Sequence, residues 1–409
     1  MVLEENIAVH VPSVREEGNG ISVHTEESKA NGDSVPVVAK KANGYAVNAA
    51  VSAQQADSGV RIVDLRSDTM TMPTPAMRAA MAAAPVGDDV VGEDPTANEL
   101  QASAAKLFGK DAALFVPSGT MGNLIAVLVH CEMRGSEVIL GSECHIVNYE
   151  QGGIATLGGV YPKVIKNSAD GTIDLSELEA AVQPSDVHFA ITRLICLENT
   201  HNRCGGRVLT AEYTDKVGEL AKRHGIKLHI DGARIFNAAT ALGVSVARLV
   251  RSADSVSVCL SKGLGAPVGS VLVGSHEFIA KATRMRKALG GGMRQIGVLC
   301  ASGLISLHDM SKRLQEDHRA ARSLAEGLNK IGALQVDVEA VESNIVFVKV
   351  SSQSPLRAGE ICASLNGVGI RCWPFENNSI RLVTSYQVTQ DDVQHAISCF
   401  QKLLLRVAV

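Results

Sequence analysis

The chain has 409 residues, of which 46% are hydrophobic, and a formal net charge of −4. This length is too great for one ordinary core, so two domains are expected. The lack of a basic surplus argues against nucleic acid as a partner, and no apolar run approaches the ~18 residues that span a bilayer. Nine cysteines with no C-x-x-C pair argue against a disulfide scaffold or zinc cluster and favour a reducing, cytoplasmic compartment.

Residues 1–60 differ from the rest of the chain. They carry eight acidic and four basic side chains, and they show neither a helical nor a strand period. They lack the apolar segment of a secretory signal, and their acidity argues against an organellar transit peptide. We expect a disordered N-terminal extension here.

From Val63 onward the pattern becomes that of an α/β protein. Short apolar runs predict strands at residues 112–116, 137–140, 191–197, 227–230, 255–260 and 269–273. Helical patterns lie between them, among others at residues 121–130 and 210–224. Strands that alternate with helices predict a mainly parallel sheet with helices on both faces.

The C-terminal quarter of the chain has a different pattern. A long helical stretch, roughly residues 297–331, is followed by two predicted strands at 344–350 and 380–384 and a helix at 390–407. We therefore expect a smaller α+β domain at residues 301–409. The large domain would then span 61–300, with 61–90 as an arm that contributes to the functional site.

The first motif with chemical meaning is Pro-Ser-Gly-Thr-Met-Gly at residues 117–122. It joins a strand to a helix, so backbone N–H groups and the positive end of the helix point at one place, which suits a phosphate. Ser118 and Thr120 add hydroxyl groups beside Gly119. An ordinary strand-to-helix turn is the alternative.

The second motif is Asp231, at the end of a predicted strand, with Arg234 three residues later. The carboxyl ends of strands in such sheets face the ligand crevice. A carboxylate there can keep a pyridine nitrogen protonated, and an arginine can bind a carboxylate or a phenolate. A helix-capping aspartate with a surface arginine is the alternative.

The third motif is Lys262, which follows Ser261 and another apolar strand and is surrounded by small residues. A lysine in such a site can form a Schiff base, although a lone lysine is usually a solvated surface charge. The order of the three motifs favours the first interpretation. A phosphate turn, a strand-end aspartate and a strand-end lysine about thirty residues later supply partners for the phosphate, ring and aldehyde of one cofactor.

Several stretches of the chain together resemble one known family. They are DLRSDT (64–69), GEDPT (92–96), FVPSGTMGN (115–123), ENTHNRCGG (198–206), HIDGARIFN (229–237), LSKGLGAPVGS (260–270) and GGGMRQ (290–295). From about residue 63 to the end, the chain resembles the low-specificity L-threonine aldolases. These are pyridoxal-phosphate (PLP) enzymes of the aspartate-aminotransferase-like superfamily, so the resemblance implies the PLP-transferase fold of type I.

The resemblance also implies roles for individual residues. Lys262 would carry PLP, Asp231 would face its pyridine nitrogen, and Arg234 would touch the ring phenolate and the substrate carboxylate. The other implied roles are phosphate binding for Ser118, Gly119, Thr120 and Ser261, stacking on the ring for His145, carboxylate binding for Ser67 and Arg381, a place near the substrate hydroxyl for His201, and a phosphate contact from a neighbouring subunit for Arg294.

The implied activity is cleavage of L-threonine and L-allo-threonine into glycine and acetaldehyde, in a homotetramer with shared active sites. The base remains open among His145, His201 and a water molecule. Where many family members have tyrosine this chain has Val91, which puts side-chain preference in doubt and leaves Tyr149 as an aromatic candidate. The alternatives are a β-eliminating lyase, an aldolase for another substrate such as phenylserine, and a catalytically silent scaffold. No metal site is expected.

Overall fold

The structure is a computed structural model, and it describes residues 60–407. Apart from Val60, the predicted N-terminal extension lies outside these described residues. Within residues 60–407, no helix has both the length and the apolar character that crossing a membrane requires. All nine cysteines lie in the described part as free thiols, and seven of them are buried, as expected for small apolar side chains.

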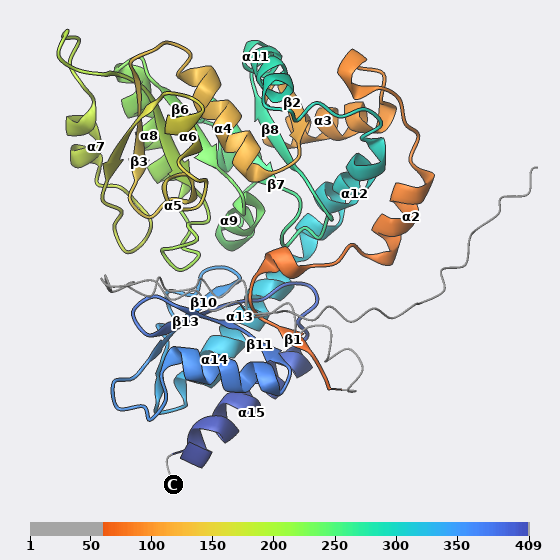
Figure 1. Cartoon of the computed structure of the whole chain (residues 1–409), viewed down its shortest axis with the longest axis vertical. Coiled ribbons are helices and arrows are strands. Elements are labelled where there is room, and N and C mark those ends of the chain that lie inside the picture. The colour runs from red at the N-terminus through yellow and green to blue at the C-terminus, as the bar shows by residue number, and fades with distance from the viewer. Residues whose placement is uncertain (1–59, 408–409) are drawn as a thin grey trace, which may run out of the picture. The chain divides into compact units, whose positions relative to one another are not determined.

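A seven-stranded sheet forms the centre of the larger part of the fold (Figure 1). Its strands are β2 (Ala112–Val116), β3 (Ser136–Gly141), β4 (Tyr161–Ile165), β5 (Ile191–Glu198), β6 (Lys227–Asp231), β7 (Ser255–Cys259) and β8 (Ser270–Gly274). Their order is β2-β8-β7-β6-β5-β3-β4, and β8 alone runs antiparallel to its neighbours. The mainly parallel sheet predicted from the sequence is therefore confirmed.

Helices cover this sheet. They are α2 (Pro75–Ala83), α3 (Pro95–Phe108), α4 (Gly119–His130), α5 (His145–Asn148), α6 (Gly153–Thr156), α7 (Leu175–Ala181), α8 (Ala211–Arg223), α9 (Ile235–Leu242), α10 (Val246–Leu249), α11 (His276–Ala288) and α12 (Gly297–His308). The helix ends follow from local chemistry. At α3, for example, the Asp94 carboxylate accepts a hydrogen bond from the Ala97 backbone nitrogen, and Gly109 ends the helix with φ +62°, a value that favours glycine.

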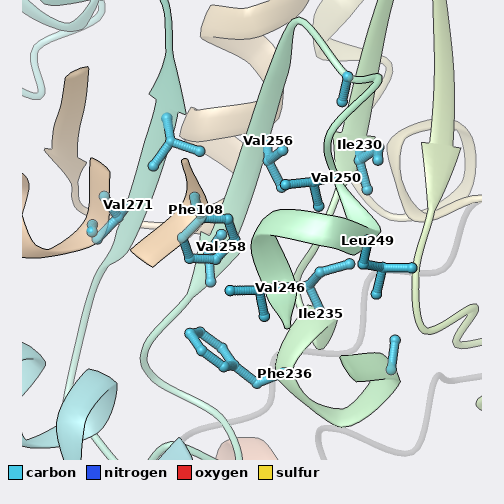
Figure 2. Packing of buried hydrophobic residues seen from close by; sticks show 14 of the residues in the cluster. Phe108, Ile230, Ile235, Phe236, Val246, Leu249, Val250, Val256, Val258 and Val271 are labelled. Atoms are coloured by element: carbon cyan, nitrogen blue, oxygen red, sulfur yellow. The ribbon is translucent and has the colours of Figure 1, made fainter. Parts of the chain in front are cut away.

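The largest core lies between the sheet and the helices that pack on it. Figure 2 shows part of it, where side chains of β6, β7 and β8 meet those of α9 and α10. The rings of Phe108 and Phe236 meet edge to face there, with centroids 5.6 Å apart. Apolar side chains lie on both faces of the parallel strands: Ile139 and Ile195 belong to this largest core, whereas Val138, Leu140 and Leu194 belong to a separate cluster. The strands are therefore packed on both sides, which holds them rigidly.

A second, antiparallel sheet lies in the C-terminal part, in the order β12-β13-β10-β9. Its strands are β9 (Leu334–Gln335), β10 (Ile345–Val350), β12 (Trp373–Phe375) and β13 (Ser379–Val383), and its helices are α13 (Leu314–Asn329), α14 (Ala358–Gly367) and α15 (Gln390–Val407). Both strands predicted in this region are confirmed, and so is the terminal helix. One face of the sheet and these helices share a separate apolar core.

The long helix predicted at residues 297–331 is wrong as a single element. The structure has α12, a 3₁₀ turn η3 (Met310–Arg313) and then α13. The two helices serve different cores: α12 packs against α2 and α3, whereas α13 packs against α15 and β10. A straight helix could not bury its apolar residues in both cores, so the chain bends between them.

The segment before α2 crosses to the C-terminal part. Strand β1 (Val63–Asp64) pairs in parallel with β11 (Ile370–Arg371), and Leu65 is fully buried in the C-terminal core. The Leu65 carbonyl accepts a hydrogen bond of 2.9 Å from the Val383 backbone nitrogen. The 3₁₀ turn η1 (Asp68–Met70) follows, and this crossing brings the Arg-Ser-Asp of residues 66–68 between the two parts.

Candidate functional site

The three sequence motifs meet at one edge of the large sheet, because the strands β2, β6 and β7 that precede them all run the same way. Asp231 is the last residue of β6, and Lys262 follows the end of β7 by three residues. Lys262 is half-buried, and its carbonyl accepts a 2.8 Å hydrogen bond from the Thr71 hydroxyl. The crossing segment therefore contacts the loop that presents the lysine.

The turn after β2 has the features of a phosphate cradle. The Ser118 hydroxyl caps α4 by accepting from the Met121 nitrogen at 3.2 Å, which leaves its proton to donate. A Cβ added at Gly119 would lie 2.7 Å from the sulfur of Cys259, so only a glycine lets the helix start approach β7 this closely. The buried Ser270 hydroxyl nearby has no hydrogen-bond partner among the described residues. Backbone N–H groups and unused hydroxyls fit a phosphate group.

Asp231 is buried, and its carboxylate is anchored on both oxygens. Oδ1 accepts from the Ala233 nitrogen at 3.1 Å, and Oδ2 accepts from the Asn123 amide at 2.9 Å. The same amide donates 2.9 Å to Glu150, so Asn123 holds two carboxylates side by side. Such a carboxylate at a strand end fits the protonated nitrogen of a pyridine ring.

His145, Glu150 and Asp231 also place one potential metal ligand each within 4.8 Å of the others. The sequence showed no such cluster, because Asp231 lies far along the chain from His145 and Glu150. The carboxylates of Glu150 and Asp231 are already hydrogen-bonded to Asn123. We therefore interpret the cluster as the polar wall of the cofactor site.

Arg234 forms a buried ion pair instead of lying free in the site. Its Nε and Nη2 donate to the Asp68 carboxylate at 2.8 and 2.6 Å, and the two side chains are 6% and 0% exposed. Burial alone would raise the pKa of Asp68, but the Arg234 charge outweighs it and holds that pKa far below its usual range. The Asn344 amide donates to the same carboxylate at 3.2 Å.

His145 begins α5 and is held by Glu150. Its Nδ1 lies 2.9 Å from the Glu150 Oε1, which leaves Nε2 as the outward nitrogen, and 32% of the side chain is exposed. Burial lowers the pKa of His145, but the Glu150 hydrogen bond and the Asp231 charge more than reverse this, so the pKa is raised. Tyr149 packs at a tilt against the imidazole, and its hydroxyl accepts from Arg203 at 2.8 Å.

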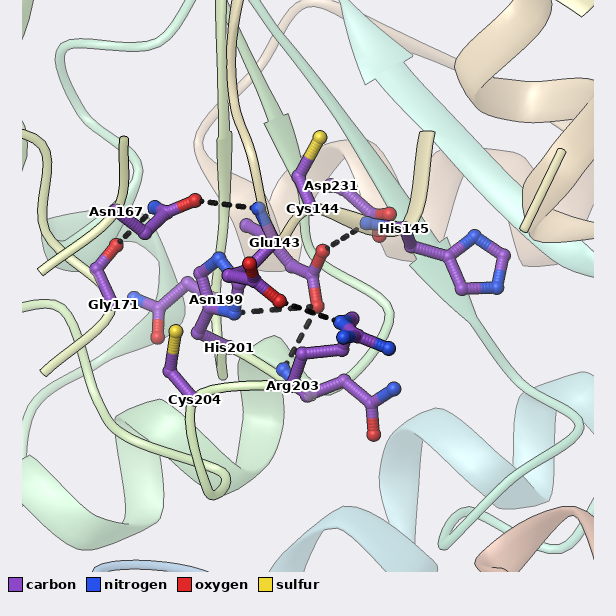
Figure 3. A network of polar contacts seen from close by, with 12 residues as sticks. Glu143, Cys144, His145, Asn167, Gly171, Asn199, His201, Arg203, Cys204 and Asp231 are labelled. Carbon is purple, nitrogen blue, oxygen red and sulfur yellow. Dashed lines mark hydrogen bonds and ion pairs between the residues drawn. The ribbon is translucent and has the colours of Figure 1, made fainter. Parts of the chain in front are cut away.

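Glu198, the last residue of β5, joins the two histidine-bearing loops. Its carboxylate accepts from the backbone nitrogens of His145 at 2.6 Å and Asn202 at 2.8 Å. His201 itself is only 1% exposed, and its ring nitrogens have no hydrogen-bond partner in the described part of the chain. Its side chain packs on Gly171: a Cβ added at Gly171 would lie only 2.8 Å from the Cβ of His201. Figure 3 shows this loop and, beside it, Asn167, which accepts from the Glu143 nitrogen and donates to the Gly171 carbonyl.

Ser67 and Arg381 are brought together although 314 positions separate them. Arg381, on β13, donates from Nη1 to the Arg66 carbonyl at 3.3 Å and from Nη2 to the Asn202 amide oxygen at 2.7 Å. Ser67 follows Arg66 directly and caps η1. The arginine predicted to bind a carboxylate is thus positioned between the arm and the loop that holds His201.

Arg294 forms no hydrogen bond or ion pair with Lys262, Asp231 or Ser118 in the described part of the chain. Its side chain is 60% exposed and pairs with Asp88 at 2.7 Å, at the start of the turn that contains Val91. Four residues that the sequence interpretation missed support the site: Asp68, Asn123, Glu150 and Glu198. Asp68, Asn123 and Glu198 stand inside the stretches that carry the family resemblance, but no local pattern indicated their partners.

Replacing Glu150 by glutamine is expected to lower the pKa of His145, because the charged acceptor of its Nδ1 proton is lost. An NMR titration of the His145 ring protons would measure the change. Glu143→Gln is the matched control, since that carboxylate contacts Arg203. An unchanged pKa in the Glu150 variant would show that another group raises it.

Three comparisons with known proteins agree with this geometry. The family model described as "Beta-eliminating lyase" matches residues 64–351. The low-specificity L-threonine aldolase 1 of Arabidopsis thaliana is 58% identical over 348 residues, which cover 85% of this chain and 97% of that protein. Among solved structures, the threonine aldolase of Leishmania major is similar with a TM-score of 0.70 at 21% identity, covering 83% and 99% of the two chains. SPT, solved with PLP, has a TM-score of 0.66 at 20% identity, covering 88% and 97%.

Proposed function

This chain belongs to the family of low-specificity L-threonine aldolases, and from this premise we propose that it cleaves L-threonine and L-allo-threonine into glycine and acetaldehyde with the help of PLP. The observation that carries the proposal is the meeting of three motifs at one sheet edge. The cradle at Gly119, the anchored Asp231 carboxylate and the half-buried Lys262 lie at the carboxyl ends of strands β2, β6 and β7. A binding scaffold would need none of these.

The residues fit PLP by their chemistry. Ser118, Gly119 and Thr120 would hold the phosphate with Ser261 beside them, Asp231 would hold the ring nitrogen, and Lys262 would bind the aldehyde carbon. When bound, PLP supplies an electron sink for the pair released from the Cα–Cβ bond. His145 would cover one face of the ring. The protein then has to orient the substrate and to move protons.

Orientation falls to the groups around Arg381. Its guanidinium, fixed by the Arg66 carbonyl and Asn202, would bind the substrate carboxylate together with the Ser67 hydroxyl. Arg234, whose charge is held in place by Asp68, would support the carboxylate and the ring phenolate. When the carboxylate and the amino group of the substrate are both fixed, their positions determine which bond at Cα stands perpendicular to the ring. That bond is the one that breaks.

We assign removal of the hydroxyl proton to His145. Its Nδ1 is engaged by Glu150, so Nε2 is the atom that accepts the proton, and the ring is 32% exposed. His201 is a weaker candidate as the base because it is 1% exposed. We propose that His201 instead shapes the pocket around the hydroxyl, with Tyr149 along the side-chain channel. The neutral form of His145 is the active one, so the rate should rise with pH through its raised pKa.

The substrate assay tests the function. Purified protein with PLP is offered L-threonine, L-allo-threonine and L-phenylserine separately, and the products are identified. We expect glycine together with acetaldehyde from the first two, and the rate on phenylserine measures how Val91 shapes the pocket. A 2-keto acid with ammonia and without glycine, 2-oxobutanoate from the two threonines or phenylpyruvate from phenylserine, would contradict the aldolase proposal and favour β-elimination.

We also propose a cytoplasmic homotetramer in which neighbouring subunits share active sites. Support comes from Arg294, exposed beside the turn with Val86, Val90 and Val91, which are 45, 40 and 65% exposed. Mixing an Arg294→Ala protein with an inactive Lys262→Ala protein should restore part of the activity, because some hybrid sites then contain both intact residues. Native mass spectrometry gives the subunit number, and hybrids no more active than the Arg294→Ala component would contradict the shared site.

A further inference from the structure

A chain of four side chains, here called the relay, leads away from Asp231 through the protein interior. Asn123 Nδ2 contacts Asp231 Oδ2 at 2.9 Å, and its Oδ1 lies 3.1 Å from His229 Nε2. His229 Nδ1 lies 2.8 Å from the Ser255 hydroxyl, which lies 2.8 Å from His130 Nε2. Asn123, His229 and Ser255 are almost completely buried.

The donors in the relay follow from what each neighbouring group can accept. The nitrogen of the Asn123 amide must face Asp231 and Glu150, because carboxylates only accept hydrogen bonds. Its oxygen must then accept from His229, so His229 carries its proton on Nε2. If His229 is neutral, its Nδ1 accepts the Ser255 proton, and the Ser255 oxygen accepts from His130. Every donor in the relay then points toward Asp231.

The burial of both histidines supports the neutral state. Desolvation lowers the pKa of His229 to about 4, in spite of the nearby Asp231 charge. Desolvation, with a further contribution from His229, lowers the pKa of His130 to about 3. A neutral imidazole donates from one ring nitrogen and accepts at the other. The hydrogen bonds on the two sides of the His229 ring therefore point in the same direction along the relay. Aligned hydrogen bonds in a low-dielectric interior strengthen one another.

We propose that the relay holds the Asp231 carboxylate oriented toward the pyridine nitrogen of the cofactor. The inference rests on the proposed role of Asp231 and adds four positioning residues that do not touch the cofactor. The relay also explains the polar choices at these places. His229, in the middle of β6, pairs with Ser255, the first residue of the neighbouring strand β7, and apolar side chains would otherwise fill the core at these positions.

The test compares the binding of two cofactors to the full-length protein after removal of its own. One is PLP, and the other is 1-deaza-PLP, in which a C–H group replaces the ring nitrogen. The wild type should bind PLP more tightly, because only PLP can donate to Asp231. His229→Leu and Ser255→Ala should each reduce this preference about three- to tenfold, the range for one hydrogen bond. Equilibrium dialysis gives both dissociation constants.

The matched controls are His318→Leu and Ser306→Ala. His318 is buried, lies 2.9 Å from the Asn237 amide oxygen and has its pKa lowered to about 4, as His229 does. Among the described residues, no side-chain hydrogen bond connects His318 to the relay. Ser306 is a fully buried serine on α12. Both controls should keep the preference of the wild type for PLP. Loss of the preference in the controls as well would show a general structural effect and overturn the relay.

The remaining outcomes distinguish a failure of the proposed role of Asp231 from a failure of the relay. A wild type that binds both cofactors equally contradicts the role of Asp231, and the relay with it. A wild type that prefers PLP, with relay variants that keep the full preference, contradicts the relay alone. If circular dichroism shows that His229→Leu does not fold, Ser255→Ala decides the question, since it removes a single hydroxyl group.

Discussion

Lys262→Ala is expected to abolish turnover, by at least about 10³-fold, while the protein still folds. Lys262 follows the buried strand β7, and its hydrogen bond to Thr71 uses the backbone carbonyl, so the side chain can be removed without breaking that contact. Without the amine, the cofactor cannot be held covalently. After borohydride reduction, mass spectrometry of peptides should find the cofactor on Lys262 in the wild type and on no lysine in the variant.

Lys110→Ala is the matched control for this experiment. Lys110 is also half-buried, but its ammonium donates to the Ala253 carbonyl at 2.6 Å, and burial lowers its pKa. Its removal should affect stability and leave the labelling of Lys262 unchanged. Normal turnover in Lys262→Ala would show that the lysine assignment is wrong.

Asp68→Leu is expected to destabilise the protein by about 3–5 kcal/mol, because it leaves the Arg234 guanidinium buried without its partner. Urea unfolding measures the effect. The double variant Asp68→Leu with Arg234→Met should recover part of the stability, since no buried charge remains, yet stay inactive. Glu179→Gln, which breaks an exposed pair with Arg223, should change stability by only about 0–1 kcal/mol.

The same ion pair predicts a pH dependence of stability. The pKa of Asp68 is lower in the folded protein than in the unfolded chain. Its contribution is therefore present above the unfolded pKa of about 4, and it is lost as the pH falls through the folded pKa. The wild type should lose stability on acidification more steeply than the double variant. Parallel curves, or a single variant as stable as the wild type, would contradict the structural importance of the pair.

Local patterns were sufficient for most of the regular structure. The six strands predicted for the large sheet are confirmed to within one residue at either end, because continuous apolar runs of this length suit parallel strands buried on both faces. Strand β4 was missed. It is an edge strand with Pro162 and Lys163 in its middle, and its side chains are partly exposed, so its composition lacks the signal of a buried strand.

In the site, too, the sequence predicted features that depend on neighbouring residues and missed contacts between distant residues. Motifs that end a strand or begin a helix could be placed from the sequence, because their position depends on residues a few places away. The sequence interpretation left Asp231 and Arg234 open to ordinary alternatives, a helix cap and a surface arginine. The structure shows both side chains buried, with partners 108 and 166 positions distant.

The sequence by itself determined the α/β class, the strand-end positions of Gly119, Asp231 and Lys262, and through its family stretches the use of PLP. The tertiary structure decided which side chains hold these groups in place: Asn123 for Asp231, Asp68 for Arg234, and Glu198 for the two histidine loops. It also decided that the expected long helix divides between two cores. The physical reason is that local periodicity reports which face of an element is buried, whereas a hydrogen bond or ion pair between distant segments exists only once the sheet has brought their ends together.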